Sequence, residues 1–165
     1  MSAVNYPALA EVLILLAVAN GAPVVAARLC GGKLAWPIDG GVRFIDGRPL
    51  FGPSKTIRGL VVSLVATTIA APLLGLDLYI GALIAAAAMA GDLFSSFCKR
   101  RLGLAPSSRA TGLDQIPESL FPLLACRSPL SLSALDIALG CVIFFVGEII
   151  LSVLFFRFRL RDRPY

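Results

Sequence analysis

An acidic, hydroxyl-bearing and basic cluster stands at the end of a long apolar run. Asp92 follows the apolar residues 78–90, and Ser95, Ser96 and Lys99 come three, four and seven positions after it. On a helix, this spacing places all four side chains on one face. Carboxylates bind Mg²⁺, whereas hydroxyls and lysines bind phosphate. Because a carboxylate beside so apolar a run is costly to keep, the cluster predicts a functional site where a membrane helix meets water.

The composition is that of an integral membrane protein. The chain has 165 residues, of which 58% are hydrophobic and only 15% are charged. A soluble domain of this size needs more polar surface. Histidine is absent, so any chemistry must use carboxylates, a metal ion and fixed positive charge. The four cysteines form no Cys-x-x-Cys pair, which argues against a zinc site or a disulfide framework. We expect a single membrane domain over residues 1–165.

Five stretches of the chain are candidate membrane helices. A bilayer core of about 30 Å requires about 20 helical residues. Four stretches approach or exceed this length, and another is short and contains two prolines. No basic residue precedes the first stretch, so residues 1–11 lack the charged region of a cleavable signal peptide. The predicted fold class is an all-α helix bundle, with spans at residues 7–27, 57–74, 78–97, 116–126 and 131–156.

The basic residues predict the orientation of these spans. Fourteen of the 15 Lys and Arg residues fall on one side if residues 116–126 cross the membrane, and only Arg127 is left on the other. The positive-inside rule then predicts five transmembrane helices, with the N-terminus outside and the C-terminus in the cytoplasm. The brevity and the prolines of residues 116–126 also suit a broken or tilted helix. Both polar segments, residues 28–56 and 98–114, are expected on the cytoplasmic face of the cell membrane.

The first polar segment contains residue types that bind anions. Its four glycines between residues 40 and 52 allow backbone N–H groups to approach an anion, and Ser54, Lys55 and Thr56 add further donors. Lys55, Thr56 and Arg58 lie at the start of the second expected helix, where free N–H groups favour phosphate. The segment is not a Walker A loop, because two residues separate its last glycine from the lysine. The alternative is a basic anchor that only sets the topology.

An ordered set of short motifs resembles one enzyme family. The motifs are Ala-Asn-Gly-Ala-Pro at 19–23, Pro-Ile-Asp-Gly at 37–40, Asp-Gly-Arg at 46–48, Ser-Lys-Thr-Ile-Arg-Gly at 54–59, Gly-Asp-Leu at 91–93, Ser-Phe-Cys-Lys-Arg-Arg-Leu-Gly at 96–103 and Leu-Asp-Gln at 113–115. In this order they resemble the CDP-archaeol synthases, small five-span membrane cytidylyltransferases related to CDP-diacylglycerol synthase. The resemblance runs from Asn20 to about Glu118.

The resemblance implies transfer of a cytidylyl group from CTP to a lipid phosphate, with release of pyrophosphate and a requirement for Mg²⁺. The implied catalytic residues are Asp92, Asp114 and Lys99, and Glu118 joins the two aspartates as a candidate metal ligand. The expected partners are CTP, the lipid phosphate and the bilayer, without nucleic acid, and a homodimer is left open. Residues expected to bind the substrates are Asn20, Asp39, Asp46, Ser54, Lys55, Thr56, Arg58, Ser96, Arg100 and Gln115.

One position departs from the family pattern. The related enzymes place a second acid three residues after the motif aspartate, whereas this chain has Pro117 there and its next acid at Glu118. On a helix, Glu118 either faces the same site as Asp114 or complements the helix dipole as a first-turn acid. Asp114 itself has the alternative role of a helix cap.

Two other functional classes fit part of the pattern. A small transporter subunit would explain polar residues such as Asn20 and Asp92 among apolar runs, although it would not need two basic polar loops. A catalytically weakened relative that serves as a membrane scaffold would explain Pro117. The sequence does not identify the lipid acceptor, since different lipid phosphates present the same headgroup to this site.

Overall fold

The part of the chain that the structure describes folds into five α-helices joined by loops of very different length. The computed structural model describes residues 4–105, 108 and 110–157, with side chains described up to residue 150. Within these residues no strand is assigned, and only two isolated bridges occur. The all-α prediction is therefore confirmed. The elements are α1 (Tyr6–Cys30), α2 (Ile57–Ala70), the 3-10 turn η1 (Ala71–Leu74), α3 (Leu78–Arg101), α4 (Gln115–Ala125) and α5 (Ala134–Arg157).

Among the residues that the structure describes, three helical segments are long and apolar enough to cross a membrane. They are α1, the continuous segment of α2 with η1, and α3, with mean hydropathies of 2.0, 1.9 and 1.6. The expected span 57–74 matches α2 with η1, whereas α3 continues past the expected residue 97 to Arg101. Helix α5 begins at Ala134 rather than at 131, because Ser133 and Asp136 exchange capping hydrogen bonds of 2.8 and 3.2 Å before the first turn.

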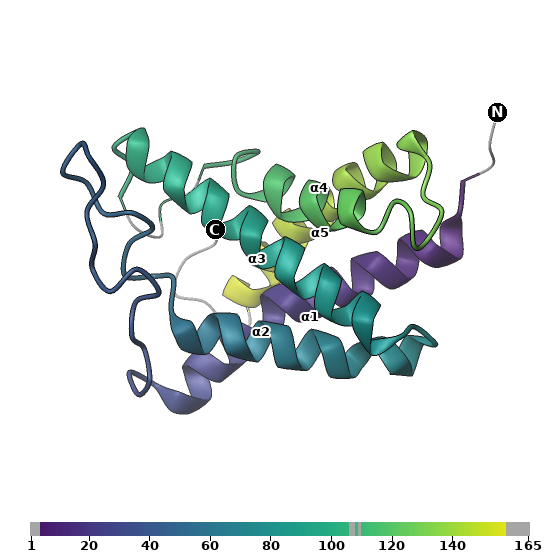
Figure 1. Ribbon diagram of the computed structural model, residues 1–165, viewed down its shortest axis with the longest axis horizontal. Helices are drawn as coiled ribbons and strands as arrows, with labels where there is room; N and C mark the ends of the chain where they lie inside the picture. The colour runs from purple at the N-terminus through teal and green to yellow at the C-terminus, as the bar shows by residue number, and fades with distance from the viewer. Residues whose placement is uncertain (1–3, 106–107, 109, 158–165) are drawn as a thin grey trace.

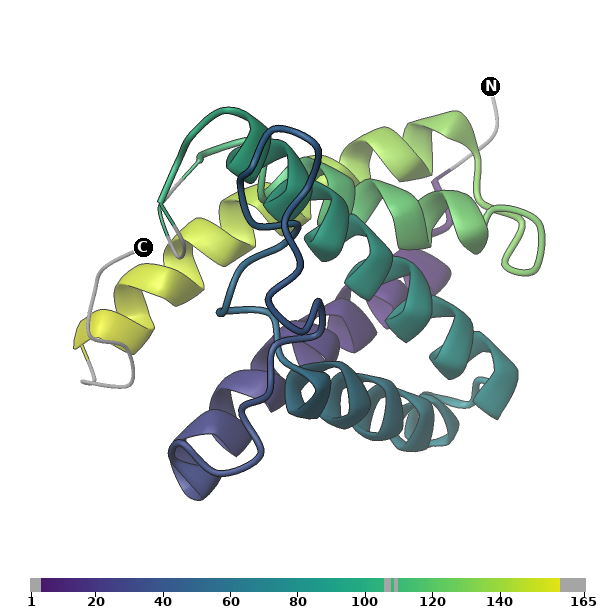
Figure 2. The ribbon, with the colours of Figure 1, turned by 60° about the vertical axis from the view of Figure 1, so that its left-hand side comes forward.

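Successive helices run in opposite directions, so alternate loops gather at the same end of the bundle (Figure 1). The long loop of residues 31–56 and the loop between α3 and α4 lie at one end, whereas the short turn after η1 and the loop between α4 and α5 lie at the other. Figure 2 shows the loop 31–56 passing from the ends of α1 and α2 toward the end of α3. The two polar segments are therefore neighbours in space.

The apolar core lies between α1 and the other helices. Its most buried large side chains are Leu15 and Leu16 of α1, Ile84 of α3 and Leu123 of α4, all with 0% exposure. Close packing of α3 on α4 depends on Gly91, where a Cβ atom would lie 2.6 Å from the carbonyl carbon of Pro117. Asp92 follows Gly91 directly in α3. The contact at Gly91 therefore determines the position of Asp92 along α4.

A second polar cluster closes the opposite end of the bundle. Asp136 is only 1% exposed, and its carboxylate accepts a 2.9 Å hydrogen bond from the backbone N–H of Asn5. The same carboxylate accepts a 2.7 Å bond from the Ser133 hydroxyl. Asn5 also caps α1, since its side chain accepts a bond from the Ala8 N–H. These contacts join the start of α1 to the start of α5 and serve the fold.

Candidate functional site

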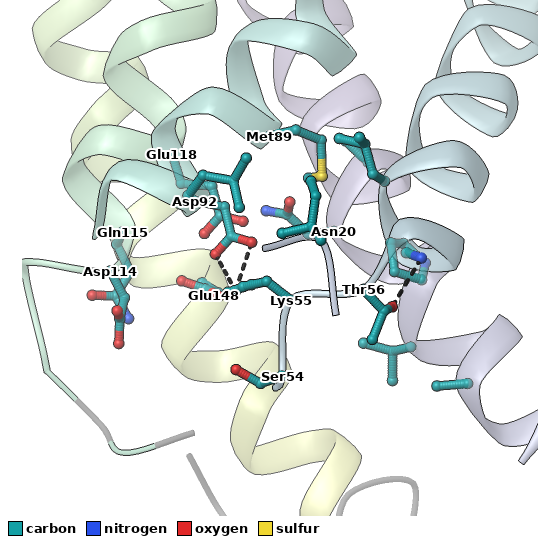
Figure 3. A pocket seen from close by; sticks show the side chains of 18 of the residues that line it. Asn20, Ser54, Lys55, Thr56, Met89, Asp92, Asp114, Gln115, Glu118 and Glu148 are labelled. Atoms are coloured by element: carbon teal, nitrogen blue, oxygen red, sulfur yellow. Dashed lines mark hydrogen bonds and ion pairs between the residues drawn. The ribbon is translucent and has the colours of Figure 1, made fainter. Parts of the chain in front are cut away.

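A cavity of about 570 Å³ opens at the end of the bundle that carries the two polar loops (Figure 3). Five helices, the loop 31–56 and the loop between α3 and α4 contribute to its wall. The apolar part of the wall includes Pro23 and Val24 of α1, Met89 of α3 and Ile149 of α5. The polar part consists of Asn20, Ser54, Lys55, Thr56, Arg58, Asp92, Lys99, Ser108, Asp114, Gln115, Glu118 and Glu148.

Two lysine–aspartate ion pairs hold the centre of this cavity. The Lys55 ammonium lies 2.6 Å from both carboxylate oxygens of Asp92, and the two side chains are 23% and 25% exposed. The Lys99 ammonium lies 2.7 Å from Asp114 Oδ1. The sequence placed Asp92 and Lys99 on one helix face, but the structure pairs each of them with a residue from another segment. Each predicted catalytic acid is therefore neutralised by a lysine of the same cavity.

Backbone pairing in the first loop places Lys55 opposite Asp92. The N–H of Ile38 donates to the carbonyl of Lys55 at 2.8 Å, and the N–H of Ile57 donates to the carbonyl of Trp36 at 3.0 Å. The Thr56 hydroxyl then caps α2 by accepting a 3.1 Å bond from the N–H of Gly59. Lys55 is thus held just before the first turn of α2, and its side chain reaches across to α3.

Asp39 organises the loop and does not line the cavity. Its carboxylate accepts hydrogen bonds from the backbone N–H groups of Phe51 at 2.9 Å, Gly52 at 3.0 Å and Gly41 at 3.0 Å. Partial burial raises the pKa of Asp39, but these three N–H donors together outweigh burial, so its pKa lies below the ordinary value. This residue, expected to bind substrate, folds the segment that presents Lys55.

Asp46 also lies away from the cavity, in a contact that fastens the loop to α3. Its carboxylate is 2.6 Å from the Arg101 guanidinium, which also donates to the carbonyl of Pro49 at 2.6 Å. The same guanidinium lies over the rings of Phe44 and Phe97, at 4.7 and 5.0 Å from their centroids. We call the contact among Asp46, Arg101, Phe44 and Phe97 the loop clasp.

Two further predicted residues are buried in the wall of the bundle. Ser96 is 2% exposed and Arg100 is 4% exposed, and neither lines the cavity. The Arg100 guanidinium donates to the carbonyl of Ala105 at 2.9 Å, close to the end of α3. Arg58 does line the cavity, but its guanidinium donates to the carbonyls of Gly31 and Lys33 and so closes the end of α1.

The remaining predicted residues do meet in the cavity. They are Asn20, Ser54, Lys55, Thr56, Arg58, Asp92, Lys99, Asp114, Gln115 and Glu118. Both polar side-chain atoms of Asn20 are buried and have no hydrogen-bond partner in the described part of the chain. Gln115 accepts a 2.8 Å bond from the Gly112 N–H, which orders the turn before α4. The cavity therefore combines cationic, carboxylate and amide groups from five helices and from both polar loops.

Glu148 is a cavity residue that the sequence analysis did not select. It comes from α5 and lines the same space as Asp92 and Glu118. Its signal was present, because a glutamate inside an apolar span raises the same question as Asp92. In the described residues, no three side chains among His, Cys, Asp and Glu are gathered closely enough to form a metal site. A cation here would need water or a substrate to complete its coordination.

Comparison with known proteins identifies the family. The family model described as CarS-like, CDP-archaeol synthase, matches residues 8–165. The CDP-archaeol synthase of Sulfurisphaera tokodaii is 38% identical over 155 residues, which cover 90% of this chain and 89% of the relative. That of Pyrobaculum calidifontis is 42% identical over 112 residues, which cover 65% of this chain and 66% of the relative.

A solved structure agrees with these sequence relatives. It is described as an intramembrane enzyme for archaeal membrane lipids biosynthesis, and it superposes with a TM-score of 0.71 at 28% identity. The superposition covers 85% of this chain and 92% of the other. The helix bundle with its cavity, the matched family model and the near full-length relative lead to the same assignment. This chain belongs to the CDP-archaeol synthase family.

Proposed function

We propose that this chain transfers CMP from CTP to a membrane lipid phosphate, giving a CDP-lipid and pyrophosphate. The observation that carries the proposal is a cavity in which two lysines meet the acids of the family motifs, at the end of an apolar bundle. The polar part of the wall suits a triphosphate, and the apolar part suits the first carbons of a lipid. The names of the relatives make a phosphorylated archaeol the first acceptor to test.

The reaction requires alignment and charge neutralisation more than proton transfer. A lipid phosphate is already ionised at pH 7 and can attack without a general base, which accords with a chain that contains no histidine. Lys55 and Lys99 would neutralise the phosphates of CTP and the departing pyrophosphate. In the structure both ammonium groups form ion pairs with aspartates. The phosphates of CTP would therefore replace these carboxylates as partners of the two lysines.

The carboxylates of the cavity suit Mg²⁺ by their chemistry. Mg²⁺ prefers oxygen ligands and is commonly held by one or two carboxylates together with substrate phosphates and water. This mode of binding does not need three protein ligands gathered in advance. The described residues contain no such group of three. Asp92, Asp114 and Glu118 are the proposed ligands, and when bound the ion would offset charge on the triphosphate. As CTP binds, the lysines would release the two aspartates.

We further propose one domain with five membrane crossings, the N-terminus outside and the site facing the cytoplasm of the cell membrane. Support comes from the arrangement of the loops, because both basic segments lie at the end of the bundle where the cavity opens. A cytoplasmic site also places the cavity on the side where CTP is available. The crossing by α4, an 11-residue helix, decides this topology.

Cysteine labelling tests the topology. Single cysteines at Ser128 and at Ile45, in a background where the four native cysteines are replaced, should react from opposite sides of the membrane. Ile45 is 94% exposed in the loop 31–56, and Ser128 is an exposed residue of the turn after α4. An impermeant maleimide added to intact cells should label position 128 and leave position 45 unlabelled until the cells are opened. Labelling of both positions from the same side would show that α4 does not cross the membrane.

Substitution of Lys55 tests phosphate binding by the first loop. We expect Lys55→Gln to weaken CTP binding by about 1.5–3 kcal/mol, the value of a charge-assisted hydrogen bond. Isothermal titration calorimetry in detergent measures the affinity, and Lys33→Gln is the matched control. Lys33 is a basic residue of the same loop that lies outside the cavity. Equal CTP affinities for the two variants would reduce the loop to a topological anchor.

A turnover assay on the purified protein tests the proposed function itself. CTP consumption and CDP-lipid formation should require Mg²⁺ and a lipid phosphate, and should not occur with the dephosphorylated lipid. CTP binding without turnover on any lipid phosphate would favour the scaffold class. Absence of CTP binding in the presence of Mg²⁺ would favour the transporter class.

A further inference from the structure

The loop 31–56 contacts α3 at the end of that helix as well as in the cavity. In the loop clasp, the Arg101 guanidinium reaches from α3 to the carboxylate of Asp46, at 2.6 Å. It also donates to the carbonyl of Pro49 at 2.6 Å and lies 4.7 Å from the centroid of the Phe44 ring. One side chain of α3 therefore contacts three residues of the loop.

A second arginine makes the reverse contact, from the loop to α3. The guanidinium of Arg48 donates to the backbone carbonyls of Arg100, at 3.3 Å, and Arg101. These carbonyls belong to the last turn of α3, where a cation also complements the helix dipole. Gly103 allows the close approach, since its φ is +76° and a Cβ atom there would lie 3.3 Å from Arg48 Nη1. Each of the two arginines thus holds the backbone of the other, and neither lines the cavity.

Backbone hydrogen bonds connect this contact to Lys55. Residues 42–50 form a hairpin, and the two residues that follow it donate their N–H groups to the Asp39 carboxylate at 2.9 and 3.0 Å. The N–H of Ile38 then donates to the carbonyl of Lys55 at 2.8 Å. Lys55 itself returns to α3 through its ion pair with Asp92. The loop and α3 therefore form a closed ring of contacts, fastened inside the cavity by Lys55 and outside it by the two arginines.

We propose that the two arginines are positioning residues, which keep Lys55 at the cavity while its ion pair with Asp92 is exchanged for a phosphate. The inference rests on the proposed function, in which Lys55 leaves the aspartate as CTP binds. At that step the loop loses its ion pair with α3 inside the cavity, and the contact at the end of the helix remains. Arg101 then limits how far Lys55 can move, and it acts on CTP only through that lysine.

The ion pair with Asp46 is a minor part of the loop clasp. The Asp46 side chain is 38% exposed, so its charge contributes little to the contact. An asparagine at this position can still accept a hydrogen bond. The guanidinium also keeps its bond to the loop backbone and its place over the rings of Phe44 and Phe97. A test must therefore remove the guanidinium or a ring.

A double-mutant cycle with Lys55 tests the assignment. Arg101→Ala should weaken CTP binding by about threefold to tenfold, which is less than the effect of Lys55→Gln because the lysine is displaced but not removed. In the Lys55→Gln background, Arg101→Ala should change CTP affinity by less than about twofold. Isothermal titration calorimetry in detergent measures all four proteins. The same factor in both backgrounds, or no loss in either, would overturn the proposal.

Two further variants separate positioning from general damage to the fold. Phe44→Ala removes from the loop side the ring on which Arg101 lies, so it should weaken CTP binding by a similar factor and add little to Arg101→Ala. Arg43→Ala is the matched control, because the Arg43 guanidinium donates to the carbonyl of Gly47 within the loop and lies outside the cavity. It should bind CTP within about twofold of the wild type. Equal losses in Arg43→Ala and Arg101→Ala would overturn the assignment.

A distance measurement on the loop needs neither CTP nor turnover. Spin labels at Ile45 of the hairpin and at Tyr79 of α3, both exposed, report how the loop lies relative to the helix when the native cysteines are replaced. Pulsed electron paramagnetic resonance should give a narrow distance distribution with Arg101 present and a broad one in Arg101→Ala. An equally narrow distribution in the variant would overturn the proposal.

The same measurement separates this inference from the proposed function. A broadened distribution in Arg101→Ala, for a protein whose wild type does not bind CTP, would retain the anchoring of the loop and reject the proposed reaction. An unchanged distribution, for a protein whose wild type makes CDP-lipid, would reject the anchoring and retain the reaction.

Discussion

Asp92→Asn is expected to lower CTP turnover by about 100-fold to 1,000-fold while the protein still folds. The substitution keeps the size of the side chain and removes the charge that would balance a metal ion against the triphosphate. The Lys55 partner is 23% exposed and can be solvated when the pair is lost, so the bundle should persist. The measurement is the rate of CDP-lipid formation at saturating CTP and Mg²⁺, together with the melting midpoint in detergent.

Matched variants separate catalysis from a merely structural ion pair. Asp114→Asn should lower turnover by a similar factor, because Asp114 is the other motif acid in the cavity. Asp46→Asn removes the same charge from the loop clasp, outside the cavity, and should leave turnover within about threefold of the wild type. Near-normal turnover in both Asp92→Asn and Asp114→Asn would reject the proposed cytidylyltransfer at this site.

Gly91→Ala should be the most damaging of the small substitutions in the bundle. A Cβ atom there would lie 2.6 Å from the carbonyl carbon of Pro117 and 2.9 Å from the Cα atom of Glu118. Both are backbone atoms, so α4 must move away from α3 as a unit. We expect a loss of about 1–3 kcal/mol in stability from overpacking, and a large loss of turnover because Glu118 moves relative to Asp92.

The control for this prediction is another helical glycine. Gly21 lies in α1, and a Cβ atom at this position would meet nothing within 4 Å. Gly21→Ala should therefore be neutral or stabilise the helix by up to about 1 kcal/mol, the difference in helix propensity. Melting midpoints of the two variants in the same detergent give the comparison. A Gly91→Ala variant that melts and turns over like Gly21→Ala would show that the contact between α3 and α4 does not position the site.

The sequence predicts the membrane class, the all-α fold and most helix positions because these depend on local properties. The length of an apolar run determines whether a helix can cross a bilayer. The apolar runs before Asp92 and after Arg58 are long enough to be recognised as membrane helices from the sequence. The predicted span 57–74 coincides with α2 and η1 for this reason. Helix α5 begins at Ala134 and not at the predicted residue 131, because capping by Ser133 and Asp136, rather than hydropathy, determines where that helix begins.

The residue types of the site could also be predicted, since charged side chains beside apolar runs are conspicuous. Ten predicted residues line the cavity, among them Lys55, Asp92 and Asp114. Asp39 and Asp46 belong to the same motifs but bind backbone N–H groups and Arg101 within the loop. Motif membership does not distinguish a residue that contacts a ligand from one that folds the loop around it.

Only the tertiary structure decided which charges meet. Helical spacing suggested Lys99 as the neighbour of Asp92, yet the packing of α3 on α4 and the path of the first loop pair Asp92 with Lys55. Glu148 joins the site only because the last helix packs beside α4, far along the chain from every motif. Ion pairing depends on distances of a few ångströms between separate helices, and these distances are determined by contacts such as that of Gly91 with Pro117 rather than by spacing within one helix.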